Sequence, residues 1–256
     1  MKYTYPLLGF PLFGCLLAFI ISMPDGKTQT VYGISTFPHS LYEIDITGCS
    51  CSFSNIANIT YGGNVSICPD GSVYQIVIGD IYQTDISTGA STLIFSAPGV
   101  GSTSASLCPG NGIFYALVYS PTNSTLYHYN TNSGTVQNVG TVTYPAVSDM
   151  TFYNGNVYYY TWGGIVQLDL SNPANSTIVA TVPGNLPIQG LTASPYCGYL
   201  LASPFSPAVL YLINITDGTV IELCQTPSGP HGMYLTSLFE HTPACTSTLD
   251  LDCDGS

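Results

Sequence analysis

The sequence predicts an all-β protein, and three observations carry this prediction. The chain of 256 residues is 45% hydrophobic and contains 20 Tyr and 26 Gly, a composition typical of strands joined by tight turns. Outside an N-terminal apolar run, no segment has a sustained apolar period of 3.6 residues, so we expect helices to be nearly absent. Short stretches that alternate apolar and polar residues recur along the chain instead, and such alternation indicates half-buried strands.

Charged residues are scarce and mostly acidic. They make up 6% of the chain, with 2 Lys+Arg against 14 Asp+Glu and a net charge of −12. A nucleic-acid-binding protein needs a basic footprint for phosphates, so the composition argues against that class. It argues equally against a polybasic protein of the membrane surface.

The N-terminus has the features of a targeting segment. Lys2 precedes an apolar run from Leu7 to Ile21, which at about 15 residues is shorter than the roughly 20 that a membrane span needs. We therefore expect residues 1–29 to form a signal peptide that is cleaved between Ser22 and Thr30, the alternative being an uncleaved anchor. The protein is then secreted or held at the cell surface, without membrane contact after cleavage.

Cysteine usage agrees with export. Eight cysteines follow the leader: Cys49, Cys51, Cys68, Cys108, Cys197, Cys224, Cys245 and Cys253. An even number in an exported chain predicts disulfides, although eight cysteines allow 105 pairings and the sequence leaves the choice open. A zinc site is the weaker alternative, because Cys49 and Cys51 are too close for the usual ligand spacing.

A repeat of 39 to 45 residues organises the rest of the chain. Its five copies end in Asp or Asn: Leu41–Asp45, Ile81–Asp85, Leu126–Asn130, Ile165–Asp169 and Leu210–Asn214. Four copies continue into a turn with glycine, whereas the fourth has Ser171-Asn172-Pro173 there. Each copy also has a strand pattern upstream and another downstream. Four short strands with turn residues between them are typical of one blade of a β-propeller.

The two ends of the chain indicate how many blades there are. The first unit, from Thr30, lacks the innermost strand that precedes the repeat in the other units. A strand pattern at 233–240 follows the fifth unit and has no blade after it. We expect this strand to complete the first blade and close a ring of five, which removes the exposed sheet edges. Six blades are the alternative. The propeller domain then spans 30–242, and residues 243–256 form an acidic, Cys-containing tail or linker.

The repeat, with its pattern Leu-Tyr-x-Ile-Asp-x-x-Thr-Gly, resembles the propeller repeats of secreted and surface bacterial proteins, which are broadly related to quinoprotein-like and NHL-like propellers. The resemblance covers residues 31 to 240. It implies architecture rather than activity, because propellers host many unrelated functions. It also implies that further extracellular modules follow this chain.

Polar residues at the starts of the predicted innermost strands are the first candidate site. They are Asn64, Ser104, Asp149, Gln189 and His231. We expect them to surround one mouth of the central channel, where amides, hydroxyls and one carboxylate suit the recognition of ligand hydroxyl groups. The alternative is polar packing with water at the axis. Trp162, just before a Gly-Gly turn, is a candidate aromatic contact for a sugar ring.

Catalytic chemistry finds little support. Asp45, Asp85 and Asp169 share one repeat position with asparagines, which indicates turn capping rather than catalysis. One carboxylate at the channel cannot supply both the acid and the base of a glycosidase. A lactonase-like calcium site lacks a Glu in register, and no Gly-x-Ser-x-Gly elbow occurs. We expect no catalytic residues and no cofactor.

The C-terminal tail is a candidate calcium site. Asp250, Asp252 and Asp254, followed by Gly255, match the opening of a calcium-binding loop, although the later bidentate carboxylate is missing. The alternative is an acidic linker.

Taken together, the sequence predicts an exported, non-catalytic binding, adhesion or scaffold module whose partner is an extracellular glycan or a surface protein. The competing hypothesis is a propeller hydrolase or lactonase that acts on sugars or lactones.

Overall fold

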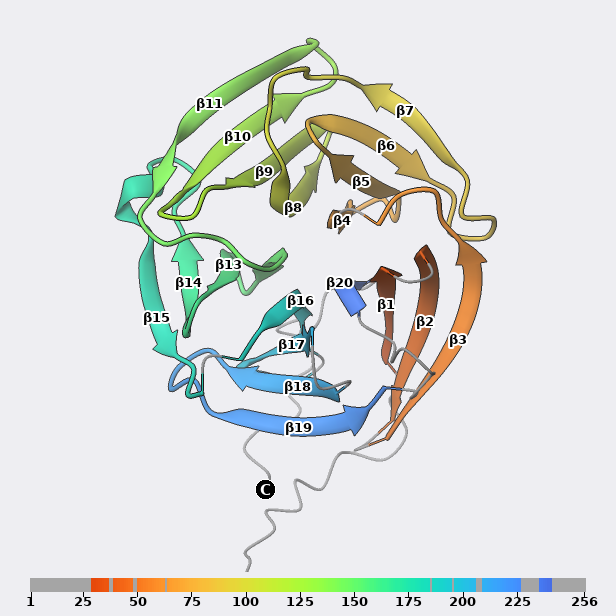
Figure 1. Cartoon of the computed structure of the whole chain (residues 1–256), viewed down its shortest axis with the longest axis vertical. Coiled ribbons are helices and arrows are strands. Elements are labelled where there is room, and N and C mark those ends of the chain that lie inside the picture. Colours follow the sequence, from red (N-terminus) through yellow and green to blue (C-terminus); the bar gives the residue numbers. More distant parts are fainter. Residues whose placement is uncertain are drawn as a thin grey trace, which may run out of the picture.

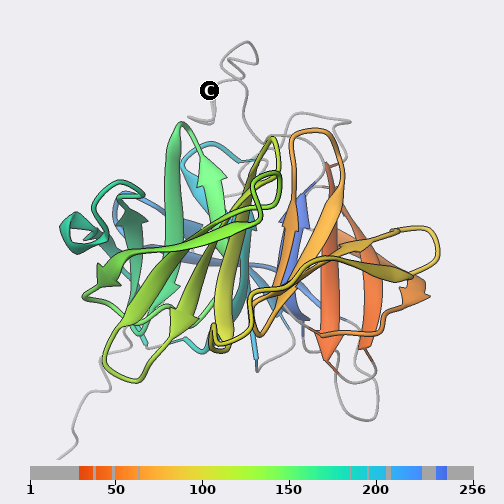
Figure 2. The same ribbon diagram turned by 90° about the horizontal axis from the view of Figure 1, so that it is seen from above.

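The computed structural model is a ring of five antiparallel sheets of four strands each (Figure 1). It describes residues 29–36, 39–47, 50–62, 64–184, 186–194, 196–205, 209–226 and 235–240. Seen from the side, the strands run between the two faces of the ring (Figure 2). The prediction of a five-bladed, all-β propeller is confirmed. Apart from Gln29, the predicted leader lies outside the described residues, and so does the predicted tail.

The blades follow one another along the chain, each built from the axis outwards, except that the first takes its inner strand from the C-terminal part. Blade 1 consists of β20 (Leu235–Glu240), β1 (Gln29–Thr36), β2 (His39–Thr47) and β3 (Ser50–Asn58). Blade 2 consists of β4 (Asn64–Ile67), β5 (Val73–Val77), β6 (Asp80–Thr84) and β7 (Ser91–Phe95). Blade 3 consists of β8 (Thr103–Gly110), β9 (Ile113–Tyr119), β10 (Ser124–Asn130) and β11 (Thr135–Val142). Blade 4 consists of β12 (Met150–Tyr153), β13 (Asn156–Thr161), β14 (Gly164–Leu168) and β15 (Thr177–Thr181). Blade 5 consists of β16 (Ile188–Ala193), β17 (Tyr199–Pro204), β18 (Val209–Asn214) and β19 (Val220–Gln225).

The C-terminal strand closes the ring. β20 pairs antiparallel with β1, with Val31 opposite Glu240, and it also contacts β4 and β16, the innermost strands of the neighbouring blades. The predicted completion of blade 1 is therefore confirmed over 235–240, and the ring has five blades rather than six. Helices are nearly absent as expected, since the described part contains one 3-10 helix, η1 (Pro173–Asn175). No helix in that part is long and apolar enough to cross a membrane.

In blades 2 to 5 the recurring Asp or Asn stands at the end of the third strand or directly after it and caps the turn that follows. Asp85 Oδ1 accepts a hydrogen bond from the Ser87 amide at 2.8 Å, and Asp169 Oδ1 accepts one from the Ser171 amide at 2.8 Å. Asn130 accepts in the same way from the Asn132 amide at 3.0 Å. These contacts confirm the capping interpretation for Asp85 and Asp169, because a short polar side chain here satisfies backbone donors that leave the sheet. Asp45 lies within β2, where its Oδ1 accepts a hydrogen bond from Thr30 Oγ1 at 2.9 Å.

Apolar side chains fill the space between blades rather than a single central core. Five clusters of buried residues each join two neighbouring blades, including blades 1 and 5. Blade 4 shows how one strand serves two interfaces: Tyr159 packs towards blade 3, whereas Tyr158 and Tyr160 pack towards blade 5. Alternation along β13 thus sends successive tyrosines to opposite faces of the sheet.

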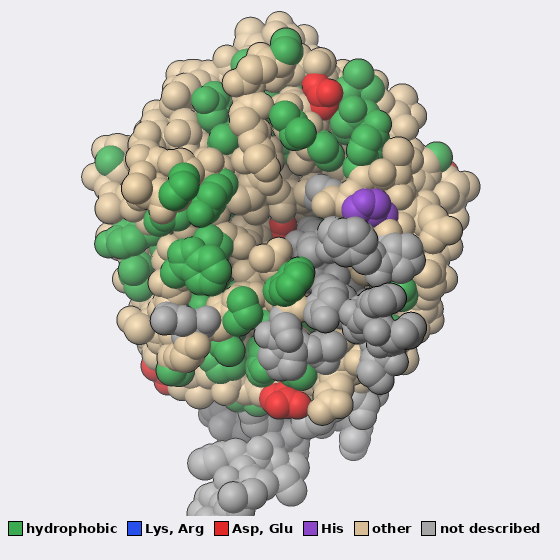
Figure 3. Space-filling view, viewed as in Figure 1, with side chains coloured by type: hydrophobic (Ala, Val, Ile, Leu, Met, Phe, Trp, Pro, Cys, Tyr) green, Lys and Arg blue, Asp and Glu red, His purple; other side chains and the backbone are tan. Residues whose placement is uncertain are grey.

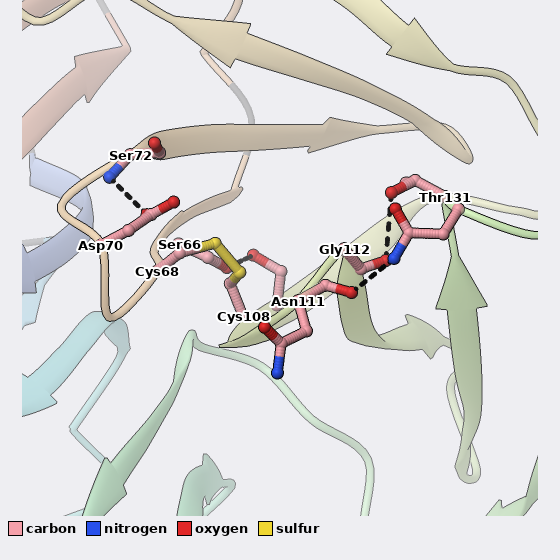
Figure 4. Close-up of a disulfide and its surroundings, with 10 residues drawn as sticks. Ser66, Cys68, Asp70, Ser72, Cys108, Asn111, Gly112 and Thr131 are labelled. Carbon is pink, nitrogen blue, oxygen red and sulfur yellow. Dashed lines mark hydrogen bonds between the residues drawn. A yellow bond between two sulfur atoms is a disulfide. The ribbon is translucent and has the colours of Figure 1, made fainter.

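Two disulfides join strands of different blades, which confirms the prediction of disulfides. Cys51 in β3 bonds to Cys224 in β19, so the outermost strands of the first and last blades are linked. Cys68, directly after β4, bonds to Cys108 in β8, with a Cα–Cα distance of 4.9 Å, and so links blades 2 and 3 (Figure 4). Cys197 is also disulfide-bonded. The remaining predicted cysteines, Cys49, Cys245 and Cys253, lie outside the described residues.

Candidate functional site

One face of the ring carries a central cavity of about 640 Å³. Its described walls come mainly from two kinds of connection: the loops that enter the innermost strands of blades 2, 3 and 4, and the turns between the second and third strands of these blades. In Figure 1 the loops that lead into β8 and β12 lie towards the viewer. Figure 3 shows the same face, where hydrophobic side chains are spread around a hollowed centre.

Three of the predicted inner-strand residues line this cavity: Asn64, Ser104 and Gln189. Asn64 Nδ2 donates to the backbone oxygen of Thr103 at 2.5 Å, which ties blade 2 to blade 3 and fixes the amide plane. Ser104 Oγ donates to the Leu117 oxygen at 3.1 Å and keeps its lone pairs as acceptors. The Gln189 side chain makes no hydrogen bond within the described part of the chain. The cavity thus offers neutral amide and hydroxyl groups from three blades.

The other predicted site residues lie elsewhere. Asp149 is 1% exposed and is not among the residues that line the cavity, although its backbone amide donates to the Gln189 oxygen at 3.1 Å. Its blade's innermost strand begins only at Met150, so Asp149 belongs to the buried end of the preceding loop. His231 and the three tail aspartates, Asp250, Asp252 and Asp254, lie outside the described residues.

Trp162 lines the same cavity, which the sequence did not reveal. It sits in the turn between β13 and β14 and is 59% exposed. At the corresponding place in blades 2 and 3, Ile78 is 66% and Tyr119 44% exposed, and both also line the cavity. The sequence could have pointed to Ile78 and Tyr119, because Ile78 directly follows β5 and Tyr119 ends β9, the second strands of their blades. Two exposed aromatic side chains, Trp162 and Tyr119, and the exposed Ile78 therefore line the cavity beside its polar groups.

A hydrogen-bonded wall fixes the part of the cavity that blade 2 provides. The backbone oxygen of Tyr61 accepts from Nε2 of the buried Gln75 at 2.8 Å, and the rings of Tyr61 and Tyr82 lie 4.4 Å apart. The hydrogen bond with Tyr61, followed by desolvation and then by the charges of Tyr61 and Asp80, raises the pKa of Tyr82 to about 12. The Tyr82 phenol is therefore neutral under physiological conditions.

The described lining of the cavity contains one histidine, His39, and no Asp, Glu, Lys or Arg. The buried hydroxyl of Thr103 has no hydrogen-bond partner among the described residues. In the same part of the chain no three His, Cys, Asp or Glu side chains come together as a metal site would need. The arrangement suits a ligand that stacks on aromatic rings and exchanges neutral hydrogen bonds.

Comparison with known proteins supports the architecture. A chain in the nidogen/laminin complex is similar, with a TM-score of 0.55 and 10% identity, over 86% of this chain and 100% of that one. The 256-residue protein is a five-bladed β-propeller. Regucalcin, a calcium-binding protein from Agrobacterium tumefaciens, has a TM-score of 0.48 and 12% identity over 82% of this chain and 78% of its own. TolB from Acinetobacter baumannii has a TM-score of 0.49 and 14% identity over 78% of this chain and 53% of its own.

The similarity to the chain in the nidogen/laminin complex concerns the fold alone, because the two sequences are 10% identical. A scan of family models found no match to the chain, and a search of curated proteins found none either. The propeller architecture is thus established, whereas the type of bacterial repeat that the sequence resembles stays a prediction.

Proposed function

We propose that this propeller is a non-catalytic binding module of an exported protein and that its central cavity binds neutral glycans. One observation carries the proposal: Trp162 shares a cavity with the neutral polar side chains of Asn64 and Gln189. A sugar presents C–H faces that pack on an aromatic ring and hydroxyl groups that pair with amides. Both kinds of contact are available here within one site.

The alternative function is a propeller hydrolase or lactonase that acts on sugars or lactones. Glycoside hydrolysis by the common mechanisms needs two carboxyl groups on either side of the scissile bond. The described cavity lining supplies none, and Asp149 is buried outside it. We therefore favour binding over hydrolysis.

The proposal places the protein outside the cell. Disulfides such as Cys51–Cys224 form and persist in oxidising compartments, which supports secretion or display at the cell surface. In this setting the partner is an extracellular glycan or a glycan-bearing surface protein. Residues 243–256 would act as an acidic linker to further modules, with calcium at Asp250, Asp252 and Asp254 as a separate prediction.

A glycan array tests the proposal directly. The chain, produced through a secretory route, should bind one or more neutral oligosaccharides, and calorimetry should then give the affinity. Trp162→Ala should weaken binding about tenfold, which corresponds to about 1.4 kcal/mol of lost stacking. Phe152→Ala is the matched control, because this aromatic side chain is 55% exposed but does not line the central cavity.

Three outcomes would contradict the proposal. Binding to no neutral glycan would rule out the ligand class. Equal loss in the Trp162→Ala and Phe152→Ala variants would move the site away from the cavity. If chromatography detects shortened saccharides released from a bound ligand, the hydrolase would be favoured instead.

A further inference from the structure

Blade 4 carries a second cavity, of about 510 Å³, at the end opposite Trp162. It lies between the turn from β12 to β13 and the connection from β14 to β15. In an antiparallel blade these two connections share one end, whereas the β13–β14 turn with Trp162 stands at the other. The second cavity is therefore separate from the proposed glycan site.

The cavity forms where blade 4 departs from the repeat. Blades 2, 3 and 5 turn through glycine after the capping residue, but in blade 4 Asp169 is followed by Ser171-Asn172-Pro173 and the helix η1. Pro173 is buried, and the Asn175 amide donates to the Asn172 oxygen at 2.9 Å. Asn175 and Ser171 from this longer connection become part of the cavity wall.

Polar side chains around the second cavity hydrogen-bond to one another and to the backbone. Gln167 Nε2 donates to Asn156 Oδ1 at 2.9 Å, and Asn156 Nδ2 donates to the Asn154 oxygen at 3.2 Å. Ser171 Oγ donates to Asp169 Oδ1 at 2.6 Å. These residues still offer a ligand the Gln167 carbonyl oxygen and lone pairs of the Asp169 carboxylate, which also accepts from the Asn175 side chain, besides the second N–H group of each amide.

The Asp169 carboxylate remains charged. The hydrogen bond from the Ser171 hydroxyl, together with those from the Asn172 and Ser171 amides, lowers its pKa. No Lys or Arg of the described chain neutralises it, because the sequence has no Arg and its two lysines, Lys2 and Lys27, lie outside the described residues. With a net charge of −12, the protein also attracts cationic partners over distance.

Phe152 completes the chemistry of the site. Its ring is 55% exposed and forms part of the same cavity as Asp169. An aromatic face beside a carboxylate suits a planar cation, which stacks on the ring while its N–H groups point at the acceptors. A guanidinium group carries five such donors in a rigid fork, and an ammonium group lacks this plane.

We propose that this second cavity binds an arginine side chain of a partner protein, with the guanidinium group stacked on Phe152 and hydrogen-bonded to Asp169 and Gln167. The site is independent of the glycan site at the other end of the blade. It makes the propeller a module with two faces of different chemistry, one neutral and one selective for a cation.

Nuclear magnetic resonance with the isotope-labelled full chain tests this proposal. N-acetyl-arginine amide should shift the side-chain amide signals of Asn156 and Gln167 in a saturable way. N-acetyl-citrulline amide, which has the same shape but no charge, should not shift them at equal concentration. Raising the salt concentration should weaken the arginine effect several-fold, because a partly exposed ion pair is screened.

Single substitutions can distinguish binding at the second cavity from non-specific attraction of cations to the acidic protein. Asp169→Asn should weaken binding about fivefold or more while keeping the turn, because Asn130 and Asn214 occupy the same repeat position and accept the same backbone hydrogen bonds. Phe152→Ala should have a similar effect. Asp85→Asn is the matched control: Asp85 has the same Ser87 contacts as Asp169 has with Ser171, but it lines neither cavity.

Binding should be unchanged in the Asp85→Asn and Trp162→Ala variants. Equal shifts with citrulline amide would remove the role of charge, and an equal loss in Asp85→Asn would reduce the effect to non-specific attraction. N-acetyl-lysine amide that binds as tightly as the arginine compound would overturn the guanidinium assignment. Because the glycan assay relies on Trp162, the two proposals fail independently.

Discussion

Three tyrosines with fully buried rings differ in what their hydroxyl groups contact. Tyr159 donates to the Tyr144 oxygen at 2.9 Å, and Tyr160 donates to the Leu186 oxygen at 2.8 Å. The buried hydroxyl of Tyr129 has no hydrogen-bond partner among the described residues. Burial raises the pKa of all three phenols, so each is neutral in the folded protein.

This difference predicts opposite effects of one chemical change. Tyr129→Phe should leave the free energy of unfolding unchanged or raise it by about 1 kcal/mol, because it removes a buried hydroxyl group that makes no hydrogen bond to a described residue. Tyr159→Phe should lower it by about 1 kcal/mol, because the Tyr144 oxygen loses its donor. Urea unfolding of the two variants measures both values, and a loss of stability in Tyr129→Phe equal to that in Tyr159→Phe would contradict the prediction.

At the scale of single residues, sequence reasoning found part of the central cavity. Asn64, Ser104 and Gln189 were predicted at the channel mouth because each begins an innermost strand, and they do line the cavity. Asp149 was chosen by the same rule but is buried, since strand alternation does not fix where a loop ends and a strand begins. Tyr119 was missed because it ends a strand whose other aromatic and aliphatic residues point into the core.

At the scale of elements, the turn after each repeat shows how the blades contact one another. Gly89, Gly134 and Gly218 occupy the same turn in three blades, with φ values of 72°, 68° and 76°. A Cβ atom on Gly89 would collide with the backbone oxygen of Asn58, and one on Gly218 would collide with that of Thr181. Gly134 has open space around it. The first two turns are therefore packed against the outer strand of the preceding blade.

Alanine at these three glycines should separate backbone strain from packing. Gly134→Ala should lower the free energy of unfolding by about 1 kcal/mol, the cost of a left-handed conformation for a residue with a Cβ. Gly89→Ala and Gly218→Ala should cost about 1–3 kcal/mol more, because the neighbouring strand must move. Thermal and urea unfolding give the values, and equal losses at all three positions would show that the contact between blades contributes nothing.

The turns also show what a sequence pattern can and cannot reveal about elements. The Asp or Asn cap was predictable, because its position recurs and its chemistry is local. The departure at Ser171-Asn172-Pro173 was visible as well, but its consequence was not. That consequence depends on Phe152 and Asn156 from another connection of the blade, and a cavity is a property of several segments at once.

At the scale of the whole molecule, a strand pairing and a disulfide both close the ring where the first and last blades meet. β20 pairs with β1 inside the ring, and the Cys51–Cys224 disulfide joins β3 to β19 at its outer edge. The strand closure followed from the missing inner strand of the first repeat. The pairing of cysteines did not follow from the sequence, because proximity across 173 residues arises only after the ring has closed. Cys68 and Cys108, in contrast, stand about one repeat apart, at a separation of 40 residues.

The two disulfides should therefore stabilise the ring in different ways. In the chain-entropy model, loops of these lengths correspond to upper limits of about 5 kcal/mol for Cys51–Cys224 and about 4 kcal/mol for Cys68–Cys108. We expect the double variant Cys51→Ala/Cys224→Ala to lose stability and to speed amide hydrogen exchange in β3 and β19, because only β20 and the apolar cluster between these blades still close the ring there. The double variant Cys68→Ala/Cys108→Ala is the control, and its exchange should rise in blades 2 and 3 instead. A uniform rise of the exchange rates across all five blades in the first variant would contradict this prediction. It would mean that the ring opens as one cooperative unit and that the Cys51–Cys224 disulfide does not stabilise β3 and β19 locally.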